Sequence, residues 1–192
     1  MLFRSVVLLA RSAHAHRQLN TLFETRQVAK VYHALVAGSP PWQDTSLDLP
    51  LRPNGDRRHR TLPDPQDGLP SSTDFHLLER FTGYALLEAQ PHTGRAHQVR
   101  AHLSTLGLPL LGDPLYGGPP ALFLSQIKPG LTTRDNECPI LARPALHARS
   151  LSLAHPLDIS PLHFEAPYPK DFNAALRQLR RYTAASRRGD PA

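Results

Sequence analysis

Cysteine, lysine and long apolar runs are scarce in this 192-residue chain. Cys138 is the only cysteine, which excludes an internal disulfide and a cluster of thiolate metal ligands and favours a reducing compartment. No apolar run approaches the roughly 18 residues that a membrane span needs, so we expect a soluble protein that does not enter a membrane. These absences together predict a cytoplasmic location.

The composition is that of an ordinary globular protein, with 40% hydrophobic and 20% charged residues. We expect one domain over residues 1–182 and a disordered tail over residues 183–192. The formal net charge is +6, and 19 of the 22 basic residues are arginine. Arginine makes bidentate contacts to phosphate, so this balance favours a polyanionic partner such as nucleic acid. Solvated surface arginines would explain the charge equally well.

Three stretches show the period of an amphipathic helix. The first is predicted from the capping residue Ser12 to Arg26, the second from the capping residue Thr93 to Gly107, and the third from Asp171 onward. Their apolar stripes consist of Ala15, Leu19, Leu22 and Phe23 in the first, Ala96, Val99, Leu103 and Leu106 in the second, and Phe172, Ala175, Leu176 and Leu179 in the third.

Alternation of apolar and polar side chains predicts four strands. The second and third of them, residues 74–80 and 84–89, would form a hairpin through Thr82 and Gly83. The apolar stretch Val6–Ala10 reads as the end of a further strand, and the polar, proline-rich stretch Arg52–Ser72 as a mobile surface loop. Helices and strands are mixed without βαβ regularity, which predicts an α+β fold with a mainly antiparallel sheet. The alternating stretches are residues 28–37, 74–80, 84–89 and 145–153.

The segment PHTGRAHQVRAHLSTLGLPLLGDPLYGG, residues 91–118, is the most informative part of the chain. With Val99 at the centre of the apolar helix face, Arg100 lies at the margin of that face and is half buried. A guanidinium in that position needs a carboxylate partner, which we expect from another part of the fold. Arg95, His97 and His102 are typical of a solvated helix face.

Histidine spacing argues against a metal site. His92, His97 and His102 are five residues apart, so neighbours on a helix diverge by about 140° and cannot share one ion. His14 and His16 diverge by about 200° on the first helix. We therefore predict that the protein holds no metal.

The run TGRAHQVRAHLSTLGLPLLGDPLYGG resembles the hallmark segment of the RluA-type pseudouridine synthases, which isomerise uridines in structured RNA. The resemblance extends from about Val6 to about Arg181, and four collinear segments make it far more specific than one motif. It implies the catalytic-domain fold of this family without its amino-terminal part, no cofactor, and ribosomal or transfer RNA as partner. We also expect a monomer. The other three segments are LLARSAHAHRQLNTLFETRQVAKVYHALVAG, LLERFTGYALLEAQPHTGR and RPALHARSLSLAHPLDISPLHFEAP.

The resemblance implies that an aspartate attacks a uridine flipped out of the RNA, and that the released uracil rejoins the ribose through carbon. Arg100 falls where the family has the arginine that pairs with this aspartate. Tyr32 falls where it has a tyrosine that contacts the base and can transfer a proton. Val99 or Leu103 would form an apolar wall of the pocket. By pattern alone, Tyr32, Val99 and Leu103 are equally typical of a packed core.

Basic and polar side chains nearby are candidate contacts to the RNA. Arg95, His97 and Gln98 would contact the RNA backbone or the ends of the pocket. Lys30 and the cluster Arg57–Arg60 are weaker candidates, because a basic loop is more often simply solvated. Such contacts would position the RNA without selecting its sequence.

The chain departs from the family at its amino end. The family motif has the form H-R-L-D-x-x-T-S-G, and counting back places Phe3, Arg4 and Ser5 at Thr-Ser-Gly and the aspartate before Met1. The first aspartate of the chain is Asp44. We expect a truncated synthase that is inactive as it stands. The alternatives are a non-catalytic RNA-binding homologue on the same scaffold and, more weakly, an unrelated metal-dependent hydrolase.

Overall fold

The structure, a computed structural model, describes residues 5–132, 136–156 and 158–183. Phe3 and Arg4 and the predicted tail after Thr183 lie outside these residues. No helix in the described ranges has the length and apolar character needed to cross a membrane. The helices are α1 (Ala13–Glu24), α2 (Gln98–Thr105) and α3 (Lys170–Tyr182), with single turns η1 (Pro114–Tyr116) and η2 (Leu124–Gln126). The strands are β1 (Ala29–Ala37), β2 (Asp44–Asp48), β3 (Leu51–Arg52), β4 (Leu62–Pro63), β5 (Ser72–Phe81), β6 (Tyr84–Pro91), β7 (Leu146–Ala154) and β8 (Pro161–Glu165).

Six strands form one sheet in the order β2-β5-β6-β1-β7-β8, and all neighbouring pairs are antiparallel. Strands β3 and β4 form a separate two-stranded ribbon. These pairings confirm the predicted α+β fold with a mainly antiparallel sheet. The predicted hairpin is β5 and β6, and its turn contains Gly83, whose φ of 77° suits a residue without a Cβ.

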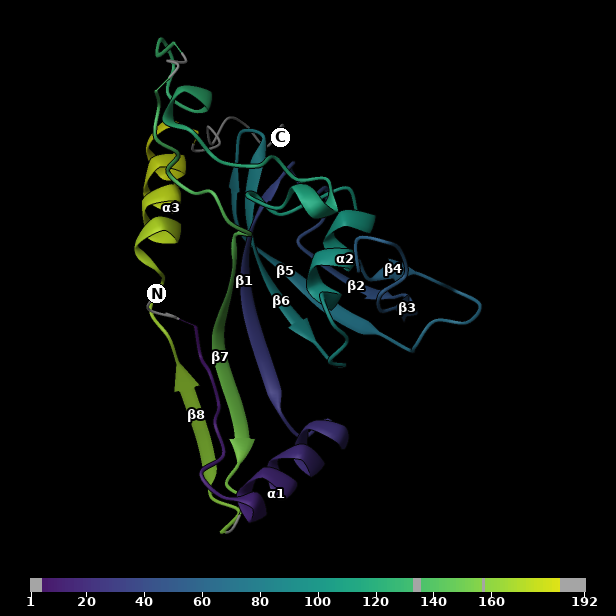
Figure 1. The fold of residues 1–192 in the computed structure, drawn as a ribbon. Coiled ribbons are helices and arrows are strands. Elements are labelled where there is room, and N and C mark those ends of the chain that lie inside the picture. Colours follow the sequence, from purple (N-terminus) through teal and green to yellow (C-terminus); the bar gives the residue numbers. More distant parts are fainter. Residues whose placement is uncertain (1–4, 133–135, 157, 184–192) are drawn as a thin grey trace, which may run out of the picture.

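The sheet divides at Tyr32, in its central strand. Strand β1 pairs with β7 from Ala29 onward, but with β6 only from Tyr32, which lies opposite Ala89. Beyond this point β6 diverges from β1, and a narrow arm carrying α1 and β8 extends away from the rest of the molecule (Figure 1). We define the arm as residues 5–31 and 150–165, and the main body as the other described residues.

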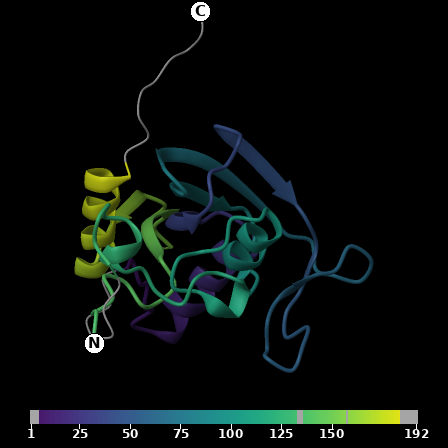
Figure 2. The same ribbon diagram turned by 90° about the horizontal axis from the view of Figure 1, so that it is seen from above.

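Helices α2 and α3 cover opposite faces of the sheet in the main body (Figures 1 and 2). Successive side chains of a strand point to opposite faces, so Leu35 of β1 packs in the cluster with α3, while Ala34 packs in the cluster with α2. Phe172 of α3 and Leu103 of α2 are both 0% exposed. The described main body therefore has a large core on each face of the sheet, and a small third cluster contains Leu51, Ala101 and Tyr116.

The arm has a much smaller core. Helix α1 starts as predicted, because the Ser12 side chain accepts a hydrogen bond from the backbone N–H of Ala15, yet it contains no buried residue. Only Val28, Leu151 and Leu153 are buried in the cluster beneath it.

The second helix begins later than predicted. Helix α2 starts at Gln98. The residue before it, His97, has a φ of 52° in the left-handed region, so the helix cannot extend further toward the amino end. Thr93 is therefore not its cap. Ala96 lies before the helix and is exposed, whereas Val99 and Leu103 are buried on the helix as expected.

Three further expectations about local structure were wrong. Val6–Ala10 is not a strand: Val6 donates one backbone hydrogen bond to Ala148 on β7, and regular pairing does not follow. The stretch predicted as a mobile loop contains part of the β3–β4 ribbon, and Thr61 within it is 1% exposed. The strands β2 and β8, each five residues long and at an edge of the sheet, were missed.

Candidate functional site

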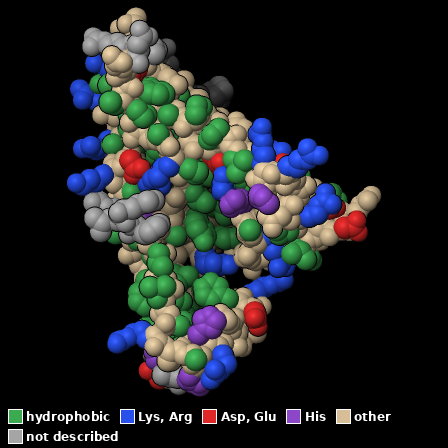
Figure 3. Space-filling model, viewed as in Figure 1, with side chains coloured by type: hydrophobic (Ala, Val, Ile, Leu, Met, Phe, Trp, Pro, Cys, Tyr) green, Lys and Arg blue, Asp and Glu red, His purple; other side chains and the backbone are tan. Residues whose placement is uncertain are grey.

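A pocket of about 400 Å³ opens where β6 leaves β1, beside α2; we call it the Arg100 pocket. Seven of the eight side chains predicted to act on the substrate line it, and Leu103 is the exception. Lysine and arginine side chains lie around the hollow between the main body and the arm (Figure 3). Among the described residues, no aspartate or glutamate lines the pocket: the lining residues are Phe23, Lys30, Tyr32, Pro91, Thr93, Gly94, Arg95, His97, Gln98, Val99, Arg100 and Leu146.

Arg100 is held by a buried carboxylate. Its Nε donates to Oδ2 of Asp113 at 2.8 Å, and its Nη2 donates to Oδ1 at 2.7 Å. The Asp113 side chain is 1% exposed and that of Arg100 16%. Arg100 therefore has a carboxylate partner, but this is Asp113 in the turn after α2, whereas the resemblance implied the catalytic aspartate. The bidentate geometry fixes the plane of the guanidinium. Asp113 does not line the pocket, so it supports Arg100 from behind.

Tyr116 supports the same guanidinium from a second direction. The Arg100 guanidinium carbon lies 4.6 Å from the centroid of the Tyr116 ring. The hydrogen bonds to Asp113 use Nε and Nη2 of Arg100. Among the described residues, none accepts a hydrogen bond from Nη1. Arg100 therefore combines a fixed position with a donor that remains available to a ligand.

Tyr32 lies on the face of β1 that looks toward α2, at the point where the sheet divides. Burial raises the pKa of its phenol, so the hydroxyl keeps its proton at neutral pH. Within the described part of the chain this hydroxyl has no hydrogen-bond partner. Tyr32 can therefore offer a ring face and a free hydroxyl to a bound molecule.

Val99 and Leu146 supply apolar surface to the pocket. Leu103, one turn further along α2, is 0% exposed and belongs to the core between α2 and the sheet. The two apolar candidates therefore differ. Val99 reaches the pocket, while the prediction of a substrate contact for Leu103 is corrected, because its side chain is packed behind the pocket wall.

Lys30 bridges the opening between the two branches of the sheet. Its Nζ donates to the backbone oxygen of Thr93 at 3.1 Å, and burial lowers the pKa of its amine. The same ammonium lies close to Gly94, where a Cβ would meet it at 3.7 Å. Lys30 is thus a charged side chain in the pocket wall and a link between β1 and the turn before α2.

Gln98 has a structural part in that turn. Its Oε1 accepts from the Thr93 hydroxyl at 2.7 Å and from the backbone N–H of Arg95 at 3.0 Å. Its Nε2 donates to the Ser72 carbonyl oxygen at 2.9 Å and to Oγ1 of Thr73 at 3.0 Å. These four bonds use its amide group, so Gln98 positions the turn. Gln98 also lines the pocket, and its predicted contact to the RNA backbone or to the end of the pocket stays a prediction.

Arg95 and His97 remain at the pocket rim. Arg95 donates through Nε and Nη2 to the Pro70 carbonyl, at 3.3 Å and 3.2 Å. His97 has its Nδ1 3.1 Å from the Tyr116 hydroxyl. Desolvation and the Arg100 charge lower the pKa of His97, so its ring is neutral at pH 7. His97 can therefore contact a ligand as a hydrogen-bonding group.

A projecting segment, residues 51–69, is anchored to the same rim. Thr61 donates its backbone N–H to the Tyr116 hydroxyl at 2.8 Å and its own hydroxyl to the Ala96 carbonyl at 2.7 Å. Of the basic cluster within this segment, Arg60 pairs with Asp56 at 2.7 Å, whereas Arg57 and Arg58 are exposed. The cluster thus lies outside the pocket on an ordered support.

The histidines of the 91–118 segment have separate partners. His92 lies 2.6 Å from Asp74, and His102 is buried with its Nδ1 2.9 Å from the Thr73 hydroxyl. Within the described ranges, no three histidine, cysteine, aspartate or glutamate side chains gather in a way that could hold a metal ion.

Sequence reasoning missed Asp113, Tyr116 and Phe23 as parts of the site. Asp113 and Tyr116 both lie in the GDPLYGG run that ends the 91–118 segment, so the motif itself was the available signal. Gly112 permits this tight turn, because a Cβ there would collide with the Arg143 carbonyl. Phe23 was assigned to the apolar stripe of α1, but its ring is 43% exposed beside the pocket.

Comparison with known proteins identifies relatives of the chain. The sequence model of a family described as RNA pseudouridylate synthase matches residues 6–105. RNA pseudouridine synthase 2, chloroplastic, of Oryza sativa subsp. japonica is 33% identical over 192 residues, covering 94% of this chain and 43% of the relative. Ribosomal large subunit pseudouridine synthase D of Xanthomonas campestris is 35% identical over 180 residues, covering 93% of this chain and 52% of the relative.

Solved structures show the same similarity. Human RNA pseudouridylate synthase domain containing 4 superposes with a TM-score of 0.68 at 28% identity, covering 88% of this chain and 69% of that one. The chain spans about half the length of the curated relatives it matches.

Proposed function

The chain belongs to the RNA pseudouridylate synthase family, and we propose that it forms most of the uridine pocket of an enzyme that makes pseudouridine in ribosomal or transfer RNA. One observation carries the proposal: Tyr32 and Arg100 line one acid-free pocket, and Asp113 fixes the Arg100 guanidinium. A pocket with a free tyrosine hydroxyl and a preorganised cation suits a flipped base and its anionic backbone.

The proposed reaction needs a nucleophile that the described residues do not supply. The bond between N1 of uracil and C1′ of ribose breaks, and a bond from C5 to C1′ forms; C5 releases a proton and N1 gains one. The family resemblance implies an aspartate as nucleophile. No carboxylate of the described chain lines the Arg100 pocket. We propose that this aspartate is not among the 192 residues and that the 192-residue chain alone is inactive.

The position of the first described residues supports an aspartate that is supplied from before Val6. Val6 donates to the Ala148 carbonyl at 3.2 Å, and Ala148 lies opposite Tyr32 in the sheet. Neighbouring strands are about 4.8 Å apart, so Val6 is about 10 Å from Tyr32 across the sheet. The glycine that ends the family motif aligns with Ser5, directly before Val6. The motif has six residues from its aspartate to this glycine, and six extended residues span up to about 20 Å. A segment of that length can reach the pocket.

Each pocket side chain then has a proposed part in the reaction. Arg100 would donate through Nη1 to the nucleophilic carboxylate and keep it ionised. The Tyr32 hydroxyl, protonated at neutral pH, would exchange a proton with the turned uracil. Val99 would contact the base, and Lys30, Arg95 and His97 would contact the RNA backbone.

Restoring the carboxylate tests the proposal. Residues 1–5 are replaced by the nine-residue family motif His-Arg-Leu-Asp-Xaa-Xaa-Thr-Ser-Gly, and the protein is incubated with RNA that carries tritium on C5 of uridine. We expect tritium release from this extended protein, and none when its motif aspartate is changed to asparagine. Release by the unmodified 192-residue chain would contradict the need for an external aspartate.

The absence of a carboxylate from the pocket lining also favours a second candidate, a non-catalytic RNA-binding homologue. The same experiment separates the two. An extended protein that is folded and binds RNA, yet releases no tritium, would support the binding homologue.

We also propose that the protein works as a monomeric domain in the cytoplasm. Cys138 is an exposed free thiol, which suits a reducing compartment. Equilibrium sedimentation at micromolar concentration should give the mass of one chain.

A further inference from the structure

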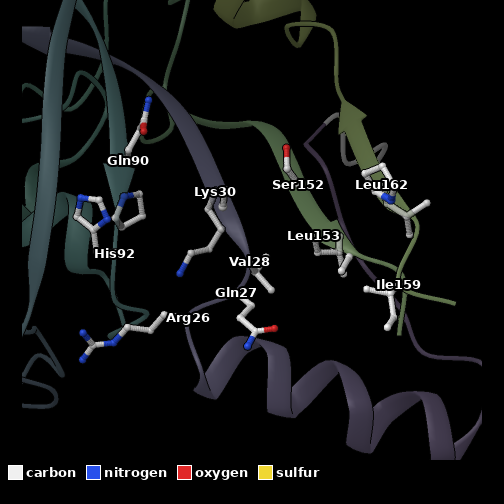
Figure 4. A pocket seen from close by; sticks show the side chains of 14 residues that line it. Arg26, Gln27, Val28, Lys30, Gln90, His92, Ser152, Leu153, Ile159 and Leu162 are labelled. Atoms are coloured by element: carbon white, nitrogen blue, oxygen red, sulfur yellow. The ribbon is translucent and has the colours of Figure 1, made fainter. Parts of the chain in front are cut away.

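A second and larger cleft, of about 750 Å³, lies beside the Arg100 pocket (Figure 4). It is bordered by the turn between α1 and β1, by the end of β6, and by β7 and β8 in the arm. Lys30 and Pro91 line both the cleft and the Arg100 pocket, so the two spaces are neighbours with a shared wall. The function proposed above makes no use of this cleft.

The division of the sheet opens the cleft. Residues 29–31 of β1 pair with β7 but not with β6, so their other edge borders the open space. The Lys30 ammonium, bonded to the Thr93 carbonyl, crosses the boundary with the Arg100 pocket. A bound polymer in an extended conformation that leaves the Arg100 pocket past Lys30 therefore enters this cleft directly.

The cleft is basic as well as apolar. No aspartate or glutamate is among its lining residues, and Arg26 has no acidic partner in the described part of the chain. Val28, Leu162 and Ile159 supply apolar surface, and Ile159 is 79% exposed. An acidic pocket adjoins the cleft at Gln90, which lines both, and it contains three carboxylates, those of Asp44, Asp74 and Glu88.

Two residues that line the cleft have unusual backbone conformations. Arg26 has a φ of 60° and Ile159 a φ of 64°, both in the left-handed region. This region is uncommon for residues other than glycine, and it is a clear outlier for a β-branched side chain such as isoleucine. Both residues nevertheless present their side chains to the cleft (Figure 4).

We propose that this cleft binds the single-stranded RNA next to the flipped uridine. Arg26 and Lys30 would hold phosphates, a base would lie against Ile159 and Leu162, and the exposed ring of Phe23 would stack a base between the two spaces. A positively charged groove combined with surfaces on which bases stack is the usual way to bind a single strand without reading its sequence. The proposal rests on the function proposed for the Arg100 pocket.

Fluorescence anisotropy with two labelled oligouridines tests it on the 192-residue chain. A trimer can fill only the Arg100 pocket, whereas a nonamer can extend into the cleft. The test variant is Arg26→Gln combined with Ile159→Asp, because both positions are at the protein surface and aspartate tolerates a left-handed backbone. The control is Arg177→Gln, an exposed arginine of α3 on the other face of the sheet.

We expect the double variant to bind the nonamer at least tenfold more weakly, with trimer binding unchanged. Its nonamer binding should also depend less on salt, by about 0.7 in the logarithmic slope for each phosphate that the variant no longer neutralises. The control should bind both oligomers like the original chain. Thermal melting of each variant establishes that it is folded.

The other outcomes separate the two proposals. Trimer binding with no gain for the nonamer, or unchanged nonamer binding by the double variant, overturns the cleft proposal and leaves the Arg100 pocket intact. An equal loss in the Arg177→Gln control overturns it as well, because the attraction is then nonspecific charge. Failure of the original chain to bind either oligomer overturns both proposals. As a second readout, nonamers with 4-thiouridine should crosslink to peptides containing residues 26–30 and 159–162.

Discussion

The main body and the arm bury their side chains to very different extents. The twelve largest fully buried side chains, including Leu35, Phe75 and Leu103, all belong to the main body. In the arm, α1 buries no residue, and large apolar side chains such as Leu9 (82% exposed) and Ile159 (79%) face solvent. The Arg100 guanidinium is thus fixed in a rigid core, whereas Phe23, Arg26 and Lys30 are presented by a part of the molecule with few stabilising contacts.

This contrast suggests a division of roles at the fork of the sheet. Preorganised charge requires a rigid support, which Asp113 and Tyr116 give to Arg100. A surface that accommodates a flexible strand can be drawn from a region of lower local stability. Substitutions in the main body should therefore have larger effects than matched substitutions in the arm or at the surface.

The largest effect should come from the buried ion pair. Asp113→Ala leaves the Arg100 guanidinium without its partner in a largely buried position, and we expect a loss of about 3–5 kcal/mol in the free energy of unfolding. The matched control is Asp171→Ala, since the pair of Asp171 with Arg143 is 35% and 40% exposed and should contribute at most about 1 kcal/mol. Urea denaturation measures both. Similar losses for the two variants would contradict the special burial of Asp113.

Leucine-to-alanine substitutions on α2 and on α1 should differ in the same direction. Leu103→Ala on α2 removes a side chain that is 0% exposed, with an expected loss of about 3 kcal/mol. Leu19→Ala on α1 removes a side chain that is only partly buried, with an expected loss of about 1 kcal/mol. Equal shifts of the urea midpoint would mean that the arm is packed as firmly as the main body.

Mild acid should destabilise the main body. Burial lowers the pKa of His102 below its ordinary value of 6.5, so the unfolded chain binds this proton more readily than the folded one. The free energy of unfolding should therefore fall as the pH drops from 6.5 toward the lowered pKa, by at most about 1.4 kcal/mol per pH unit for this group.

The His102→Asn variant provides the check. The free energy of unfolding of the variant should be lower than that of the original chain at about pH 7 and at about pH 5.5. The fall in this free energy between the two pH values should be smaller in the variant than in the original chain. The same pH dependence in both proteins would assign the effect to another group, of which His147, also with a lowered pKa, is the first candidate.

The smallest effect should be confined to the arm. Ser12→Ala removes the side-chain acceptor at the start of α1, a change of about 1 kcal/mol in the stability of that helix. Amide hydrogen exchange should become faster in α1 and remain the same in α2 and α3. A uniform increase across all three helices would show that the arm and the main body unfold as one unit.

Local signals in the sequence predicted much of this fold. The period of two in residues 28–37 and the capping serine Ser12 correspond to β1 and the start of α1, because both patterns depend on neighbouring residues. The start of α2 could not be predicted in this way. It depends on the left-handed His97 and on bonds from Gln98 to the distant Ser72.

The site was less predictable than the fold. Tyr32 and Arg100 were assigned through the family resemblance, and helix geometry supplied only the need for a carboxylate partner. The identity of that partner, Asp113, depends on how the turn after α2 folds back, which spacing alone does not specify. The contrast between buried Leu103 and pocket-lining Val99 likewise depends on tertiary packing.

The most direct test of the account is the tritium-release rate of the extended, aspartate-bearing protein with Arg100→Lys. Lysine keeps the charge but loses the forked geometry set by Asp113 and Tyr116. Because removal of one preorganised donor typically slows an enzyme about 100-fold to 1000-fold, we expect a loss of that size with RNA binding changed less than about threefold. An Arg100→Lys protein that is folded and releases tritium at the unchanged rate would contradict the claim that a rigidly held Arg100 completes the uridine site.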